Sequence, residues 1–435
     1  MTKANQLSLL ALFSSLLVVA AVRKTPQGLY SDPAWQLEAL QQYVEGRSIS
    51  INHTANPITS DLTQSVMAWD IWWPPATQMF VYPFARHHMT LGLSIRIIAS
   101  VGLVVGAVGW ARWFACFDLS PIILFALVFL IPWMRYASNN LFLYSAEIFM
   151  FASAPWLLLA ASSIAERWWR ADRWKPQYWA ATALLGFALG FRYCLKYSGV
   201  LMSLGIATFL IIELFPRQSG RRWIFSARGI AQSMLLGLAL LAPVLGLCWV
   251  NFKLGNAMNG ASATAGWYWR SEGLMALLSN PALALGDADS LLRFTFLNPN
   301  RPLFAHEIGL RFLGLPGGLL IVVILCRARK LSVPARLAVT VLAVSWPIMA
   351  AVWNFSQVAD YAARHLMSPS ISILPLILQE GAHWWSSTSQ RRTRWILSAA
   401  GLLYIAVPLA YGYISVFAKV IRTPETYVCG PAELY

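Results

Sequence analysis

The sequence predicts an all-α, polytopic integral membrane protein with about eleven transmembrane helices. Its 435 residues are 58% hydrophobic and 12% charged, whereas a soluble domain carries roughly 25% charged residues. Apolar runs of about 20 residues, the length that crosses about 30 Å of hydrocarbon, recur along the chain. The strict apolar–polar alternation of a membrane barrel is absent, which leaves helices as the structure that satisfies the backbone in lipid.

The first apolar run covers residues 7–22 and ends at Arg23-Lys24. Ala20-Ala21 would also suit a cleaved secretory signal, but a single lysine precedes the run, so a retained first span is favoured. The ten further spans are predicted at residues 91–110, 122–134, 141–164, 178–195, 200–215, 230–250, 308–325, 337–353, 366–384 and 395–417.

Basic residues cluster in every second link between these spans, as the positive-inside rule requires. The clusters are Arg167, Arg170, Arg173 and Lys175; Arg217, Arg221, Arg222 and Arg228; Arg327, Arg329, Lys330 and Arg336; and Arg391, Arg392 and Arg394. The pattern places the N-terminus inside and the 23–88 and 251–307 segments outside a cytoplasmic (inner) membrane. The net charge of +15 is therefore explained by contacts with membrane lipids and not by nucleic-acid binding. Residues 1–435 are predicted to form one transmembrane domain without a separate soluble domain.

The first outer loop contains a signal for a short amphipathic helix. Asp32-Pro33 opens it, Leu37, Leu40 and Val44 share one face, and Gly46 closes it. Asp at the N-cap, Pro at the first helical position and Gly after the last one are the expected order. We expect this helix to lie along the membrane surface.

Carboxylates on the outer side are the candidate catalytic groups of an otherwise acid-poor chain. Asp32 is the main candidate, and its alternative role is to cap the short helix, which would also fix the direction of its carboxylate. Asp61, Asp70 and Glu147 are secondary candidates. Trp267 and Trp269 are candidates for stacking on a sugar or acceptor, the alternative being interfacial anchoring.

Four motifs alternate with the predicted spans. They are Gly28-Leu-Tyr-Ser-Asp32 with Trp72-Trp-Pro-Pro75, then Asn139–Glu147, Phe191–Gly199 and Tyr361–Pro369. Their order resembles that of the GT-C glycosyltransferases, multispan enzymes that use polyprenyl-phosphate-linked sugars and include protein mannosyltransferases and aminoarabinose transferases. The resemblance extends to about residue 380. Two positions depart from the family pattern, because Pro33 follows Asp32 where an acidic pair is frequent and His365 stands where an aromatic residue is usual.

The resemblance implies an inverting sugar transfer from a polyprenyl-phosphate-linked donor to a glycan, lipid or protein acceptor on the outer side of the membrane. Asp32 would be the general base that accepts the proton of the acceptor hydroxyl. Arg192, Lys196 and Arg364 would bind the phosphate of the donor, although basic residues at span ends also serve as interfacial anchors. The sequence shows no cluster of metal ligands, so a divalent metal is left open and no cofactor is predicted.

Two other functions are compatible with a chain of this composition. A transporter or lipid-handling permease would place polar residues near the middle of the bilayer on interrupted helices. A non-catalytic membrane subunit could keep the same fold without activity.

Overall fold

The computed structural model describes most of the hydrophobic helices and parts of the loops between them. The described residues are 2–23, 40, 44, 46, 51–55, 65–69, 71, 73–87, 89–138, 146–170, 175–215, 226–259, 315, 317–323, 325–326, 331–355, 363–387, 389–392, 394–395 and 398.

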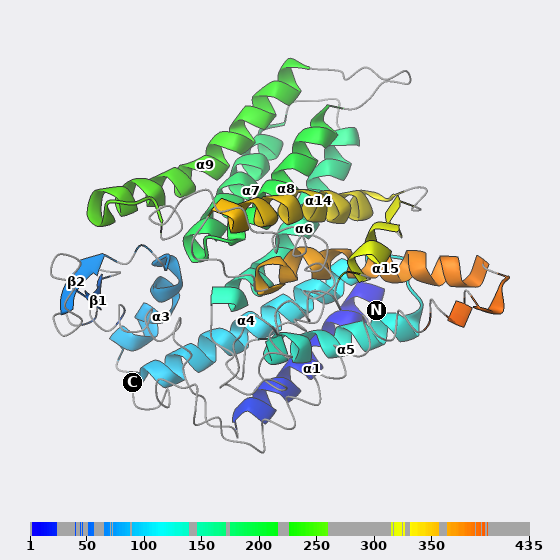
Figure 1. Ribbon diagram of the computed structural model, residues 1–435, viewed down its shortest axis with the longest axis horizontal. Helices are drawn as coiled ribbons and strands as arrows, with labels where there is room; N and C mark the ends of the chain where they lie inside the picture. The colour runs from blue at the N-terminus through cyan, green and yellow to red at the C-terminus, as the bar shows by residue number, and fades with distance from the viewer. Residues whose placement is uncertain are drawn as a thin grey trace.

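Among these residues the regular elements are helices and one small sheet, joined by turns (Figure 1). The helices are α1 (Lys3–Arg23), α3 (Ala76–Arg86), α4 (Leu91–Phe114), α5 (Pro121–Ser138), α6 (Ala146–Arg170), α7 (Pro176–Leu195), α8 (Gly199–Leu214), α9 (Ala227–Gly255), α14 (Val333–Phe355), the short 3₁₀ helix η1 (Ala363–Leu366) and α15 (Met367–Ser387). Each predicted span from 7–22 to 230–250, and those at 337–353 and 366–384, coincides with one of them.

Five of the described helices are long and apolar enough to cross a membrane, judged by length and composition. They contain Lys3–Ala21, Gly92–Phe114, Ala146–Arg167, Ala227–Gly255 and Val333–Val352. Together with the composition, they indicate a membrane protein. The full number of eleven stays a prediction, since most of 308–325 and 395–417 lies outside the described residues.

The first outer loop departs from the all-α prediction. Strands β1 (Ile51–Ala55) and β2 (Ser65–Trp69) pair antiparallel, with Ile51 opposite Trp69. Both segments contain β-branched or aromatic residues, which favour strands. The predicted surface helix agrees with what is described of it, because Leu40 and Val44 are helical and Gly46 has a positive φ of 89°.

Helix α3 is an element that the sequence analysis did not predict. It follows Trp-Pro-Pro directly, with Pro75 at its N-cap. Proline is well tolerated at a helix start because its missing N–H is not needed there. The residues that α3 buries are Ala76, Thr77, Gln78 and Val81. The loop before α4 is therefore structured by a hairpin and a helix.

Small residues allow the closest helix contacts. Helix α7 packs against α9 and α8 packs against α14. A Cβ on Gly186 of α7 would lie 2.7 Å from the carbonyl oxygen of Leu236, and one on Gly190 would overlap the carbonyl oxygen of Leu240. Glycines four residues apart on one helix face let two membrane helices approach to backbone contact.

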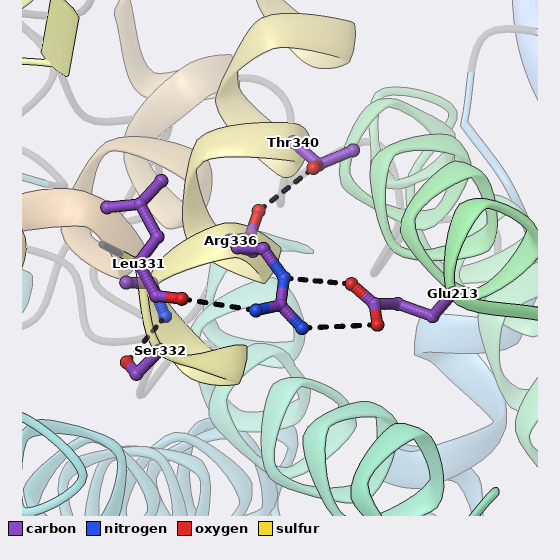
Figure 2. A network of polar contacts seen from close by, with 6 residues as sticks. Glu213, Leu331, Ser332, Arg336 and Thr340 are labelled. Carbon is purple, nitrogen blue, oxygen red and sulfur yellow. Dashed lines mark hydrogen bonds and ion pairs between the residues drawn. The ribbon is translucent and has the colours of Figure 1, made fainter. Parts of the chain in front are cut away.

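The ends of the helices meet in two separate groups, as antiparallel alternation requires. At one end Glu213, in the last turn of α8, forms a two-pronged ion pair with Arg336 in the first turns of α14 (Figure 2). The Nε–Oε1 and Nη2–Oε2 distances are 2.9 and 3.2 Å, and Arg336 also donates to the carbonyl oxygen of Leu331. This end corresponds to the predicted inner side. The starts of α6, α8 and α15 and the end of α7 meet at the opposite end.

Candidate functional site

A cavity lies where these four helix ends meet. The cavity is small, with a volume of about 20 Å³, and it is partly open to the outside. The start of α6, the end of α7 with the residues that follow it, the start of α8, and the junction of η1 with α15 each contribute to its wall. The lining residues are Glu147, Met150, Arg192, Lys196, Ser198, Gly199, Met202, His365, Met367, Ser368 and Pro369.

The chain folds tightly around this cavity because α7 and α8 are joined by a very short turn. Helix α7 ends at Leu195, and Lys196 is extended, with φ −158° and ψ 132°. The amide of Gly199 then donates to the carbonyl oxygen of Lys196 at 2.8 Å. A Cβ on Gly199 would lie 2.5 Å from the carbonyl oxygen of Arg192, so glycine at this position lets α8 begin directly against the end of α7.

Two charged residues of the cavity form an ion pair. The Lys196 ammonium donates to the Glu147 carboxylate, and both side chains are buried. Glu147 lies in the first turn of α6, where the positive end of the helix dipole stabilises a carboxylate. The pair joins α6 to the end of α7.

The third charged residue, Arg192, is buried without a carboxylate partner among the described residues. Its guanidinium Nη1 donates to the hydroxyl of Ser153 at 2.8 Å, and its Nε has no hydrogen-bond partner among the residues that the structure describes. The side chain is only 2% exposed. Ion pairs in the described part of the chain include Lys196–Glu147 and Arg336–Glu213. A buried cation that lacks a counter-ion is costly, so this arrangement favours an anionic ligand in the cavity.

The N-terminal ends of two helices strengthen the preference of the cavity for an anion. The N-terminal ends of α8 and α15 line the cavity through Ser198, Gly199 and Ser368. A helix N-terminus carries a partial positive charge, which favours anions within the first turn. Among the described lining residues, two cations and one carboxylate leave a net positive charge, to which the two helix N-termini add.

The structure brings together three of the residues that the sequence analysis selected, Glu147, Arg192 and Lys196. The backbone of Arg364 is in η1, and its neighbour His365 lines the cavity, but its side chain is outside what the structure describes. Asp32, Asp61, Asp70, Trp267 and Trp269 also lie outside the described residues. Their assignments stay predictions.

Sequence reasoning missed the residue that holds Arg192 in place. Ser153, which accepts from Arg192, lies six residues after Glu147 on α6 and donates its own hydroxyl to the carbonyl oxygen of Phe149 at 2.7 Å. Spacings of three and six residues put Glu147, Met150 and Ser153 near one helix face, a signal that could have identified Ser153. In the described residues, no group of three or more His, Cys, Asp or Glu side chains could hold a metal ion.

No protein-family model and no curated protein matches this sequence. Among solved structures, the chain is similar to the archaeal oligosaccharyltransferase AglB from Archaeoglobus fulgidus, determined in complex with an inhibitory peptide and a dolichol-phosphate. The TM-score is 0.48 at 14% sequence identity, and the match covers 98% of this chain and 56% of that chain. The chain thus spans a little over half the length of that structure. The function proposed below rests on the cavity.

Proposed function

We propose that this protein is a GT-C-type glycosyltransferase that moves a sugar from a polyprenyl-phosphate-linked donor to a glycan, lipid or protein acceptor on the outer side of the membrane. The observation that carries the proposal is the buried guanidinium of Arg192, which lines the cavity and has no carboxylate partner among the described residues. A phosphate supplies the missing negative charge and accepts from the free Nε–H. The helix ends that enclose the cavity are predicted to lie at the outer surface of the membrane, where the phosphate of a lipid-linked donor would be.

The cavity residues have defined roles in such a transfer. As the bond between the sugar and the phosphate breaks, negative charge grows on the phosphate, and fixed cations stabilise it. Arg192 is fixed by Ser153, and Lys196 is fixed by Glu147. Arg364 is proposed as a third cation at this phosphate, from its place in the sequence.

The remaining parts of the reaction are assigned from the sequence. Asp32 is the proposed general base that takes the proton of the acceptor hydroxyl as its oxygen attacks the anomeric carbon, with inversion. The alternative for Asp32 is a helix cap alone. Trp267 and Trp269 are proposed to contact the sugar or acceptor.

Lipid binding tests the charge preference of the cavity. The full-length protein in nanodiscs is titrated with undecaprenyl phosphate, with undecaprenol as the matched uncharged chain and phosphatidylglycerol as an ordinary anionic lipid. We expect undecaprenyl phosphate to bind and the alcohol to bind at least tenfold more weakly, because one charge-assisted hydrogen bond contributes about 1.5–3 kcal/mol. Equal binding of the phosphate and the alcohol would contradict an anion site, and equal binding of phosphatidylglycerol would identify an ordinary lipid site.

Turnover tests the enzymatic assignment. Release of polyprenyl phosphate from a panel of polyprenyl-phosphate-linked sugars is measured for the parent, for Asp32→Asn and for Asp118→Asn. Asp118 is an exposed acid in the link after α4, on the predicted inner side, so its variant is the matched control. Loss of turnover in Asp32→Asn alone, with unchanged folding, supports the base. Parental turnover in Asp32→Asn leaves the helix cap as its role, and the absence of turnover in the parent favours a permease or a non-catalytic subunit.

A further inference from the structure

The charged residues of the cavity lie at two depths. Arg192 and Lys196 are four residues apart at the end of α7, and Ser153 and Glu147 are six residues apart on α6. At a rise of about 1.5 Å per residue, Arg192 lies about 6 Å further from the helix ends than Lys196, and Ser153 about 9 Å further than Glu147. The contacts follow the same division, since Arg192 bonds to Ser153 and Lys196 pairs with Glu147. We refer to the two pairs as the Arg192 level and the Lys196 level.

The Arg192 level offers binding groups for one phosphate. The guanidinium is buried, and its Nη1 donates to the Ser153 hydroxyl at 2.8 Å. Its Nε has no hydrogen-bond partner in the described part of the chain. A phosphate oxygen would accept from this Nε and would compensate the charge of the guanidinium, because hydrogen bonds between ionised groups are the strong ones.

The Lys196 level offers much less to a second phosphate. The Lys196 ammonium donates to the Glu147 carboxylate, and both side chains are buried, so their charges largely cancel. Glu147 and Met150 are one turn apart on α6 and both line the cavity, so the carboxylate lies on the cavity side of that helix. A second phosphate at this level would be repelled by the carboxylate, and like charges a few ångströms apart repel strongly where water is excluded.

The size of the cavity leads to the same conclusion. Its volume is about 20 Å³. One water molecule needs about 10–15 Å³, so the cavity has room for about one or two phosphate oxygens, with the rest of the phosphate at the opening. The second phosphate of a diphosphate bound at Arg192 would therefore extend toward the Lys196 level, where Glu147 lies.

We infer that Glu147 is a specificity-determining residue, which makes the cavity select lipids with one phosphate over lipids with a diphosphate. This inference rests on the proposed glycosyltransferase function and deepens it, because it narrows the class of donor. The bond that breaks in the transfer would join the sugar to a single phosphate, and the group that leaves would be a polyprenyl phosphate. Glu147 acts by cancelling the charge of Lys196, and Arg192 binds the phosphate.

Lipid titration tests the selection directly. The full-length protein in nanodiscs is titrated with undecaprenyl phosphate and undecaprenyl diphosphate at about pH 8, where the terminal phosphates are ionised. We expect the parent to bind the monophosphate about tenfold or more tightly than the diphosphate. Glu147→Gln should reduce this preference about tenfold, mainly through tighter binding of the diphosphate, since Lys196 is then available to the second phosphate. A general loss of structure would weaken both lipids alike and would leave their ratio unchanged.

Two control variants separate charge from structure. Glu213→Gln removes a buried carboxylate from the ion pair with Arg336 at the other end of the helices, so it should keep the parental ratio. The double variant Glu147→Gln with Lys196→Met makes the Lys196 level neutral again and should also return to the parental ratio. Replacing both members of a buried ion pair is frequently tolerated, so the double variant retains the test where Glu147→Gln alone does not fold.

The outcomes distinguish this inference from the proposed function. Equal binding of the monophosphate and the diphosphate by the parent would overturn the selection, as would equal ratios in Glu147→Gln and Glu213→Gln or a changed ratio in the double variant. In these cases the anion site remains if the parent still binds undecaprenyl phosphate more tightly than undecaprenol. If the parent does not distinguish the phosphate from the alcohol, the proposed function fails together with the inference.

Discussion

Replacing Arg192 by methionine should lower the affinity for a phosphate without lowering the stability of the folded protein. The substitution removes a buried charge that has one hydroxyl partner and a free Nε–H, and it keeps an unbranched side chain of similar length. Ser153 does not become unsatisfied, because its hydroxyl still donates to the carbonyl oxygen of Phe149. We therefore expect the folded state to keep or gain stability while the affinity for a phosphate falls.

The magnitude follows from the number of donors that the cavity offers. One charge-assisted hydrogen bond from Nε contributes about 1.5–3 kcal/mol, and about 1.4 kcal/mol corresponds to a factor of ten in affinity. Arg192→Met should thus weaken undecaprenyl phosphate binding by about ten- to a hundredfold. Replacement of a buried ion by a well-packed apolar side chain is frequently neutral or stabilising by about 1–4 kcal/mol.

The assay combines lipid titration with thermal unfolding of the protein in the same nanodiscs. Arg192→Lys is the conservative variant, and it should bind with intermediate affinity because it keeps the charge and loses the planar donor geometry. A stability loss of several kcal/mol in Arg192→Met with unchanged lipid binding would refute the reasoning. That result would identify the guanidinium as a structural group whose partner lies in another part of the chain.

Three further substitutions follow from the contacts of the cavity and the helix ends. Glu147→Gln should lower stability by about 3–5 kcal/mol, because Lys196 loses its carboxylate, and undecaprenyl phosphate should restore more stability than it adds to the parent. Arg336→Met should destabilise by about 1–3 kcal/mol without weakening lipid binding, since it leaves the carboxylate of Glu213 buried at the other end. Gly190→Ala should destabilise by about 1–3 kcal/mol, because its Cβ overlaps the backbone of α9. Thermal unfolding with and without lipid measures all three.

The controls for these substitutions come from the same helices. A Cβ on Gly237 of α9 would meet nothing within 4 Å, so Gly237→Ala should unfold at or above the parental temperature. Equal stability losses at Gly190 and Gly237 would contradict the close α7–α9 contact. Reduced lipid affinity in Arg336→Met would contradict the separation of the two helix ends.

The helical part of this fold could be predicted from the sequence because one strong physical effect decides it. Long apolar runs form helices in lipid, because a helix satisfies its backbone hydrogen bonds within one segment. The first outer loop is different. Its hairpin depends on the pairing of Ile51–Ala55 with Ser65–Trp69 and on contacts with α9, which no local pattern encodes. Helix α3 had a local signal, the proline before its first turn.

For the cavity, the sequence indicated residue types at span ends but not their partners. Arg192 and Lys196 are equivalent as basic residues near a membrane surface, and either could be an interfacial anchor. The structure distinguishes them, because Lys196 pairs with Glu147 from a helix about 50 residues away, whereas Arg192 contacts a serine. The separation of the partners, 49 and 39 residues, exceeds any helical period, so only tertiary packing brings them together.

The placement of glycines helps a membrane protein to keep inside it a charge that has no carboxylate partner in the described part of the chain. The charge costs stability, and the close backbone contacts at Gly186, Gly190 and Gly199 increase packing in the two helices that surround it. Residues that serve a ligand commonly reduce stability and are supported by the packing around them. Gly199 contributes both to packing and to the cavity. Its missing side chain lets α8 start against the carbonyl of Arg192, and this start places a positive helix end at the cavity. An alanine there would push α8 away from α7 and would change the cavity wall and the helix contact together.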